Sequence, residues 1–299
     1  MATGSIDKTR ENKTLNIILV ILKLVRIRNC LIAFFGVLVG ALLVAQNPQY
    51  MGAKTYIAAL TAAVITAGGN ALNDYFDHTI DKTNKPDRPI PSGKIPRSDA
   101  LMLAAGLLLI GMGLAKTVNE YCLVIAAANT IILIAYAAYS KKMLFVANLG
   151  VSYLVASVFI FGAFSTIDAA STLNLEKIKL ASVITVCAFF MTLAREIIKD
   201  VEDMDGDRKM YSKTLPLVYG AKKAKNTAIL FAVIAILVST TPIALSFPNL
   251  NLRIYGTIVG VADLIFLSAL TMFPSLSQRM MIIGMILSLA AFFFGKTMA

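Results

Sequence analysis

Tryptophan is absent from this chain of 299 residues, and histidine occurs once. The three cysteines, Cys30, Cys122 and Cys187, each stand alone in an apolar run, and no pair has metal-ligand spacing. The single histidine, His78, has no second soft ligand beside it. The sequence therefore does not indicate a thiolate or imidazole metal centre, and we interpret the cysteines as small packing residues.

Acidic residues are also scarce, because 17 Asp and Glu stand against 28 Lys and Arg, which gives a net charge of +11. The basic residues form no stripe with interleaved aromatic residues, so nucleic acid is not an expected partner. Anionic headgroups and phosphorylated substrates are better candidates. Residues 1–14 are polar and the following apolar run is too long for the core of a signal peptide, so we predict no cleavable signal.

Apolar sequence is abundant: 58% of the residues are hydrophobic and the mean hydropathy is +0.74. Runs near the ~20 residues that cross a bilayer recur along the chain. We predict an all-α integral membrane protein, a bundle of nine transmembrane helices at residues 15–45, 54–76, 98–116, 120–140, 147–166, 179–199, 222–243, 252–272 and 279–296. Short connections predict one membrane-embedded domain over residues 1–299, with residues 1–14 as a polar N-terminal tail.

The distribution of positive charge predicts the orientation. With the N-terminus inside, 21 Lys and Arg fall in the inside segments and 6 in the outside segments. Because cytoplasmic loops carry the excess of Lys and Arg, we predict a multi-pass protein of the cell membrane with its N-terminus in the cytoplasm and its C-terminus outside.

Two acidic motifs share one spacing. Residues 73–81 read NDYFDHTID and residues 199–207 read KDVEDMDGD, and in each a polar residue is followed by Asp four and eight positions later. This duplication predicts an internal pseudo-repeat, and both motifs fall in a cytoplasmic-side polar cap. Positions i, i+4 and i+8 of a helix form one slightly drifting stripe. Each motif should therefore present one face: Asn73, Asp77 and Asp81 in the first, and Lys199, Asp203 and Asp207 in the second.

If the two helix ends face each other, four carboxylates converge and repel one another unless cations neutralise them. Two Mg²⁺ ions, held by these carboxylates, by the amide oxygen of Asn73 and by substrate phosphate oxygens, fit this arrangement. The alternative is a solvated, mixed-charge helix end, the usual explanation for one such run. Duplication at equal spacing favours the metal site.

Further polar residues occur at the same level. In the loop after the first motif, we interpret Arg88 as a phosphate contact. Each of the others can anchor the chain at the membrane surface or bind substrate, and Glu196 fits a base or a contact to a polar acceptor. They are Arg26, Arg28, Tyr139, Lys141, Lys142, Arg195 and Glu196.

Two other classes of protein use membrane aspartates. A CDP-alcohol phosphotransferase would carry a single Asp-x-x-Asp-Gly-x-x-Ala-Arg run, whereas the acids here are split between distant helices. A cation transporter would place its ionisable residues near the midplane, on broken helices.

These motifs resemble those of the UbiA superfamily of intramembrane prenyltransferases. The first acidic motif, the following Arg88-Pro-Ile-Pro-Ser-Gly loop and the second acidic motif all have counterparts in that family. Within it, the run from Arg195 to Asp207 most resembles the archaeal subfamily that makes digeranylgeranylglyceryl phosphate in ether-lipid synthesis.

The resemblance implies Mg²⁺-dependent transfer of a geranylgeranyl group from geranylgeranyl diphosphate to geranylgeranylglyceryl phosphate, with release of diphosphate. An aromatic acceptor such as hydroxybenzoate or naphthoate remains an alternative. Asn73, Asp77, Asp81, Asp203 and Asp207 would hold the metal, and the aspartates with Glu196 would be catalytic. Arg88, Lys199 and Lys141 or Lys142 would bind the diphosphate, and Arg26, Arg28, Arg195 and Tyr139 the acceptor.

Overall fold

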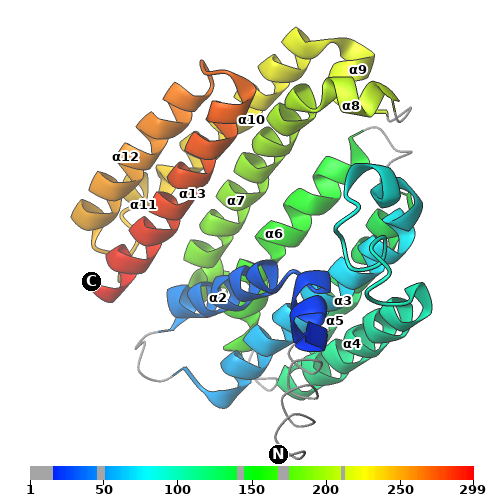
Figure 1. Ribbon diagram of the computed structural model, residues 1–299. Helices are drawn as coiled ribbons and strands as arrows, with labels where there is room; N and C mark the ends of the chain where they lie inside the picture. Colours follow the sequence, from blue (N-terminus) through cyan, green and yellow to red (C-terminus); the bar gives the residue numbers. More distant parts are fainter. Residues whose placement is uncertain (1–15, 46–50, 140–144, 168–174, 210–212) are drawn as a thin grey trace, which may run out of the picture.

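A computed structural model of the protein describes residues 16–45, 51–139, 145–167, 175–209 and 213–299. All regular structure within these ranges is helical (Figure 1). Nine helices among the described residues are long and apolar enough to cross a membrane. The predicted all-α class and the nine spans are confirmed for these residues. The pseudo-repeat, the cytoplasmic cap and the orientation of the termini stay predictions.

Eight of the spans are single helices, and the remaining span joins α10 to the short α11. Two more short helices, α8 and α9, follow α7. In chain order the helices are α2 (Ile27–Val44), α3 (Ala53–Asn84), α4 (Arg97–Val118), α5 (Glu120–Tyr139), α6 (Val146–Ser165), α7 (Leu175–Glu202), α8 (Met204–Lys209), α9 (Leu215–Tyr219), α10 (Ala221–Ser239), α11 (Thr241–Ala244), α12 (Leu252–Ala269) and α13 (Pro274–Thr297).

The first predicted span is broken. Residues 16–24 are helical, a turn follows at 25–26, and α2 then begins at Ile27. Arg26 has φ 52° and ψ 63°, a left-handed conformation that is uncommon for any residue with a Cβ atom. The side-chain amide of Asn70 on α3 donates to the backbone oxygen of Val25 at 2.9 Å, which holds the break from outside. Apolar periodicity alone carries no signal for this turn.

Helix α3 is longer than predicted, since it continues to Asn84 instead of ending at residue 76. Its 32 residues span about 48 Å at 1.5 Å per residue, against roughly 30 Å for a hydrocarbon core. The predicted boundary followed the loss of apolar residues, whereas the helical backbone runs on through the polar sequence. The first acidic motif therefore lies on the final turns of a continuous helix.

Helices α2 and α6 cross at close range. A Cβ atom at Gly40 would lie 1.9 Å from the backbone oxygen of Phe159, and one at Gly162 would lie 2.0 Å from the backbone oxygen of Val37. Small residues that let two backbones approach in this way are typical of helix contacts in membranes. The crossing fixes the separation of two helices that form walls of the site.

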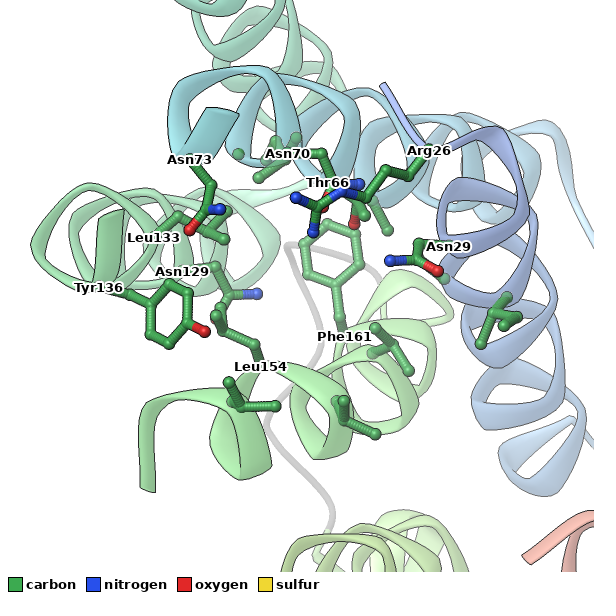
Figure 2. Close-up of a pocket in the computed structure, with 18 of the residues that line it drawn as sticks. Arg26, Asn29, Thr66, Asn70, Asn73, Asn129, Leu133, Tyr136, Leu154 and Phe161 are labelled. Atoms are coloured by element: carbon green, nitrogen blue, oxygen red, sulfur yellow. The ribbon is translucent and has the colours of Figure 1, made fainter. Parts of the chain in front are cut away.

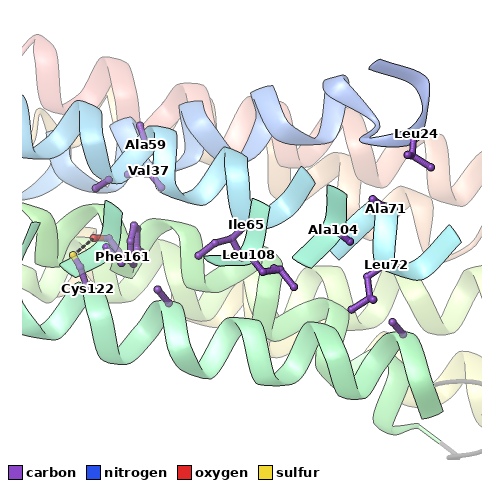
Figure 3. Close-up of a cluster of buried hydrophobic side chains, with 14 of the residues drawn as sticks. Leu24, Val37, Ala59, Ile65, Ala71, Leu72, Ala104, Leu108, Cys122 and Phe161 are labelled. Carbon is purple, nitrogen blue, oxygen red and sulfur yellow. Dashed lines mark hydrogen bonds between the residues drawn. The ribbon is translucent and has the colours of Figure 1, made fainter. Parts of the chain in front are cut away.

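Among the described residues, two large apolar clusters lie in separate groups of helices, and a third contains residues of both groups. The first lies among α2 to α6 and includes Val37, Ile65, Leu108 and Phe161 (Figure 3). The second lies among α7, α10, α12 and α13. Helix α7 packs against both α6 and α10, so it joins the two groups of helices.

Candidate active site

A cavity of about 500 Å³ lies between α2, α3, α5, α6 and α7. Figure 2 shows Asn73 and Asn70 of α3, Arg26 and Asn29 beside the helix break, and Tyr136 of α5 around it. The polar residues of its wall come from four segments of the chain. They are Arg26, Asn29, Thr66, Asn70, Asn73, Asn129, Tyr136, Arg195, Glu196 and Lys199.

The rest of the cavity wall is apolar and includes Leu133, Leu154 and Phe161. Two of its residues also belong to the outer surface of the bundle, since Ile32 is 63% and Val155 43% exposed. The surface of a membrane span faces lipid. The cavity wall thus reaches the lipid-facing surface, where a long apolar chain can lie with its polar end inside.

Both acidic motifs contribute to this cavity. Asn73 of α3 and Lys199 of α7, the first residue of each motif, line it together. The side-chain nitrogen of Asn73 donates to Oδ2 of Asp77 at 3.1 Å, which leaves the Asn73 amide oxygen for another partner. An amide oxygen beside a carboxylate is a hard-oxygen donor set of the kind that Mg²⁺ uses.

The first acidic motif divides into two faces. Each residue turns an α-helix by about 100°, so Asp81 is rotated about 80° from Asn73 but only about 20° from Asp74. Asp74 and Asp81 are both buried, and the guanidinium of Arg88 pairs with both. The expected common stripe was therefore wrong for Asp81, which lies beside Asp74 instead of beside Asn73.

Arginines occupy the buried face of the motif. Nη2 of Arg26 lies 2.6 Å from Oδ1 of Asp74, and Nη1 of Arg88 lies 3.1 Å from the same oxygen. Arg88, which we predicted to bind diphosphate, is engaged with these carboxylates in the structure. Among the described residues, Arg26 lines the cavity and Arg28 does not; Arg28 is exposed.

The second acidic motif continues past the end of α7. The backbone nitrogens of Asp203 and Asp207 bond to the oxygens of Lys199 and Asp203 at 2.9 Å each, so the helical register continues into α8. Burial raises the pKa of the Asp207 carboxyl and the charge of Asp203 raises it further, while Lys199 opposes the rise. A cation between these two acids would relieve their repulsion.

The four predicted metal carboxylates do not form one cluster. No group of three or more His, Cys, Asp and Glu side chains in the described part of the chain is close enough to hold a metal ion. Asp77 lies with Asn73, Asp81 with Arg88, and Asp203 with Asp207. The residues fit Mg²⁺ in the chemistry of their oxygens, but the convergence that the sequence predicted is not reached here.

Helix α7 brings a carboxylate and two cations to the cavity. Arg195 Nη2 donates to Glu196 Oε1, and Lys199 Nζ lies 3.8 Å from Glu196 Oε2. All three residues line the cavity, and their contacts with substrate stay predictions. The Glu196 carboxylate, paired with two cations, can accept a hydrogen bond from a hydroxyl.

Some predictions lie outside the described residues, and some residues were not predicted. Lys141 and Lys142 fall outside, as does the side chain of Tyr139 at the end of α5. Tyr136, one turn earlier, lines the cavity instead. Asn70 and Asn129 also line it. A signal existed for Asn70, because an amide three residues before Asn73 in an apolar run shares its helix face.

Comparisons with known proteins agree with this architecture. The model of the UbiA prenyltransferase family matches residues 33–279. Digeranylgeranylglyceryl phosphate synthase of Methanopyrus kandleri is 37% identical over 274 residues, covering 91% of this chain and 97% of that protein. The synthase of Methanosarcina mazei is also 37% identical, over 290 residues, covering 92% of this chain and 97% of that protein.

Solved structures share the fold. One from a study of digeranylgeranylglyceryl phosphate synthase in membranes superposes with a TM-score of 0.81 at 31% identity, covering 94% of this chain and 99% of that chain. A UbiA homologue from Archaeoglobus fulgidus, bound to GPP and Mg²⁺, superposes with a TM-score of 0.68 at 17% identity, covering 93% and 99%.

Proposed function

Since this chain belongs to the UbiA prenyltransferase family and is a membrane prenyltransferase, we propose that it transfers a geranylgeranyl group from geranylgeranyl diphosphate to geranylgeranylglyceryl phosphate. The observation that carries the proposal is 37% identity to a synthase of that product across 91% of the chain. The cavity supports it, because its polar end suits phosphate groups and its apolar wall, open to lipid, suits isoprenoid chains.

The metal in this proposal is Mg²⁺, and we expect two ions. A structural relative from Archaeoglobus fulgidus binds Mg²⁺ together with GPP. The expected ligands in this chain are Asn73, Asp77, Asp203 and Asp207. Asp81 is a further expected ligand when its ion pair with Arg88 opens. Bound there, Mg²⁺ would neutralise charge that develops on the leaving diphosphate.

Fixed positive charge from the chain also stabilises the leaving diphosphate. Lys199, on α7, and Arg26, at the helix break, both line the cavity. Donors already in place when charge develops are the most effective form of electrostatic catalysis. We expect Lys141 or Lys142 to add to this charge, and Arg88 to do so from its position beside Asp74.

The bond from the allylic carbon to the diphosphate oxygen breaks, and the electron pair leaves with the diphosphate. The apolar wall around Leu154 and Phe161 shields the resulting allylic cation from water. The ring of Tyr136, which lines the cavity, can contribute about 0.5–2 kcal/mol of cation–π stabilisation. The free hydroxyl oxygen of the acceptor then forms the new bond to the allylic carbon, and its proton passes to the released diphosphate.

The acceptor is held by the remaining polar residues. The predicted contacts to its phosphate and glycerol are Arg26, Arg28, Arg195 and Tyr139, of which Arg26 and Arg195 line the cavity. Glu196 accepts the hydrogen bond of its hydroxyl. An aromatic acceptor on the same fold is the weaker candidate, because the relatives in archaeal methanogens carry the name of the glycerol-lipid enzyme.

A single incubation tests the proposal. Purified protein is given labelled geranylgeranyl diphosphate with geranylgeranylglyceryl phosphate, hydroxybenzoate or a naphthoate, and the products are identified by mass spectrometry. We expect one product, with two geranylgeranyl ethers on one glycerol phosphate, and free diphosphate in equal amount. Turnover with the aromatic acceptors alone would contradict it.

A further inference from the structure

Beyond the residues already assigned, one buried carboxylate holds two arginines at the site. We propose that Asp74 is a positioning residue, which fixes Arg26 at the cavity wall and Arg88 over the end of α3 and does not bind Mg²⁺. The kinetic test of this inference rests on the proposed function. The structural argument uses only the contacts among Arg26, Asp74, Asp81 and Arg88.

Asp74 is 2% exposed, and a single oxygen of its carboxylate meets both guanidinium groups. Arg26 approaches it to 2.6 Å and Arg88 to 3.1 Å, and Arg88 also pairs with Asp81. A buried acid with two cationic partners is compensated, whereas removal of one partner leaves a buried charge unpaired. Asp74 thus anchors both arginines to α3.

The backbone around Arg26 is built to make this contact. Arg26 takes the left-handed conformation at the break before α2, and two side chains bind the backbone oxygen of the preceding Val25. Asn70 Nδ2 donates to it at 2.9 Å and Cys30 Sγ at 3.3 Å. A non-glycine residue in this conformation persists where its surroundings enforce it, and such residues concentrate at functional sites.

The loop that carries Arg88 is tied down as well. Lys23 Nζ donates to the backbone oxygen of Asp87 at 2.7 Å. Within the loop, the nitrogen of Ser92 bonds to the oxygen of Arg88 at 3.0 Å. The loop and the helix break are thus joined twice, through Lys23 and through the shared carboxylate of Asp74.

The arrangement leaves Arg26 able to bind substrate. A guanidinium has five N–H donors, and only one nitrogen of Arg26, Nη2, bonds to Asp74. The side chain is 32% exposed and lines the cavity. Held in place by Asp74, it meets an arriving phosphate group without first losing the rotamer freedom of a long side chain.

The same contacts argue against Asp74 as a metal ligand. A divalent cation at its carboxylate would lie against two guanidinium groups, which repel it. Asp77, three residues later, accepts a hydrogen bond from Asn73, which lines the cavity. The two acids of this motif would therefore have different roles: Asp77 would bind the metal, and Asp74 binds the arginines.

The test compares Asp74→Asn with Asp77→Asn in the purified full-length protein. Titration calorimetry with inorganic diphosphate at fixed Mg²⁺ measures anion binding, and initial rates give KM for both substrates and the half-saturating Mg²⁺ concentration. For Asp74→Asn we expect diphosphate binding and substrate affinity to weaken about 10-fold, since charged donors lose their anchor. Its half-saturating Mg²⁺ should stay within about 2-fold of wild type, whereas Asp77→Asn should raise it about 10-fold, as loss of a metal-site group does.

Two results would overturn the inference: a Mg²⁺ shift in Asp74→Asn as large as in Asp77→Asn, or wild-type diphosphate binding in Asp74→Asn. If Asp74→Asn does not fold, Asp74→Glu replaces it, because this variant keeps the charge and moves the carboxylate outward. Weaker diphosphate binding with an unchanged half-saturating Mg²⁺ concentration would support the inference. A rise in the half-saturating Mg²⁺ concentration would contradict it. Asp74→Asn should weaken diphosphate binding by a smaller factor in the Arg26→Ala variant than in the wild type. Diphosphate binding needs no acceptor, so a wild type that binds diphosphate but does not prenylate the glycerol lipid refutes the proposed function alone.

Discussion

Glu196 shows how one side chain's role depends on its immediate partners. It lies between Arg195 and Lys199 and lines the cavity with them. A carboxylate paired with two cations can accept a hydrogen bond, and we propose that it holds the acceptor's hydroxyl in place for attack on the allylic carbon.

Replacing Glu196 with Gln keeps its shape and removes its charge. We expect kcat to fall about 100-fold, because a charged hydrogen-bond acceptor that positions the attacking hydroxyl is lost. Glu202→Gln is the matched control, since Glu202 is exposed on the same helix and bonds to Gln278. Initial rates at saturating substrates measure both variants. Equal rates for Glu196→Gln and Glu202→Gln would remove Glu196 from the mechanism.

The second acidic motif allows an equally close comparison for the metal. Asp203 lies on the predicted face of the motif, and Asp205, two residues on, lies off it. Asp203→Asn should raise the half-saturating Mg²⁺ concentration about 10-fold, and Asp205→Asn by less than about 2-fold, because we propose only the carboxylate on the helix stripe as a ligand. Excess chelator should abolish turnover in the wild type. Activity that survives chelation would contradict a metal-dependent reaction.

At the scale of the helices, the crossing of α2 and α6 is the tightest packing around the cavity. Gly162→Ala would place a methyl group 2.0 Å from the backbone oxygen of Val37. Backbone cannot move aside as a flexible side chain can, so we expect a loss of about 1–3 kcal/mol in stability.

Gly113→Ala provides the control, because a Cβ atom at Gly113 meets nothing within 4 Å. Thermal unfolding of the purified variants in one detergent compares them. The melting temperature should fall for Gly162→Ala and stay near wild type for Gly113→Ala. A fall of the same size in both would mean that alanine in these helices is itself harmful, and that the crossing is not the cause.

The helices also show which features of the fold the sequence predicted and which it did not. Apolar runs predicted all nine spans, because burial in lipid needs a continuous apolar stretch. The end of α3 was missed, since polar residues such as Asp77 and Lys82 leave an apolar run without ending a helix. The break at Arg26 was missed because Asn70 and Cys30, which bind Val25, come from other turns and another helix.

The sequence predicted which residues form the candidate site better than it predicted which of them form ion pairs and hydrogen bonds with one another. Equal spacing identified both acidic motifs, and Asn73 and Lys199 do share one cavity. Spacing could not show that Arg88 folds back onto Asp74 and Asp81, because that contact depends on the path of the loop. Drift of the helical stripe, about 40° for every four residues, could have warned that Asp81 leaves the face of Asn73.

At the scale of the whole molecule, the orientation in the membrane is open to direct measurement. Helix α4 has Ser98 exposed near its start and Lys116 exposed near its end. In a background with Cys30, Cys122 and Cys187 replaced, a cysteine at position 98 should react with an impermeant maleimide only after the membrane is opened. One at position 116 should react in intact cells, because the Lys and Arg bias places it outside. The reverse pattern would invert the predicted topology.

The exposed positions of Ile32 and Val155 have a kinetic consequence for the enzyme as a whole. A cavity whose wall is shared with the bilayer receives its lipids by diffusion in two dimensions, so mole fraction in the membrane, and not bulk molarity, sets their encounter rate. Diluting both substrates with inert phospholipid at constant total amount should slow turnover in proportion.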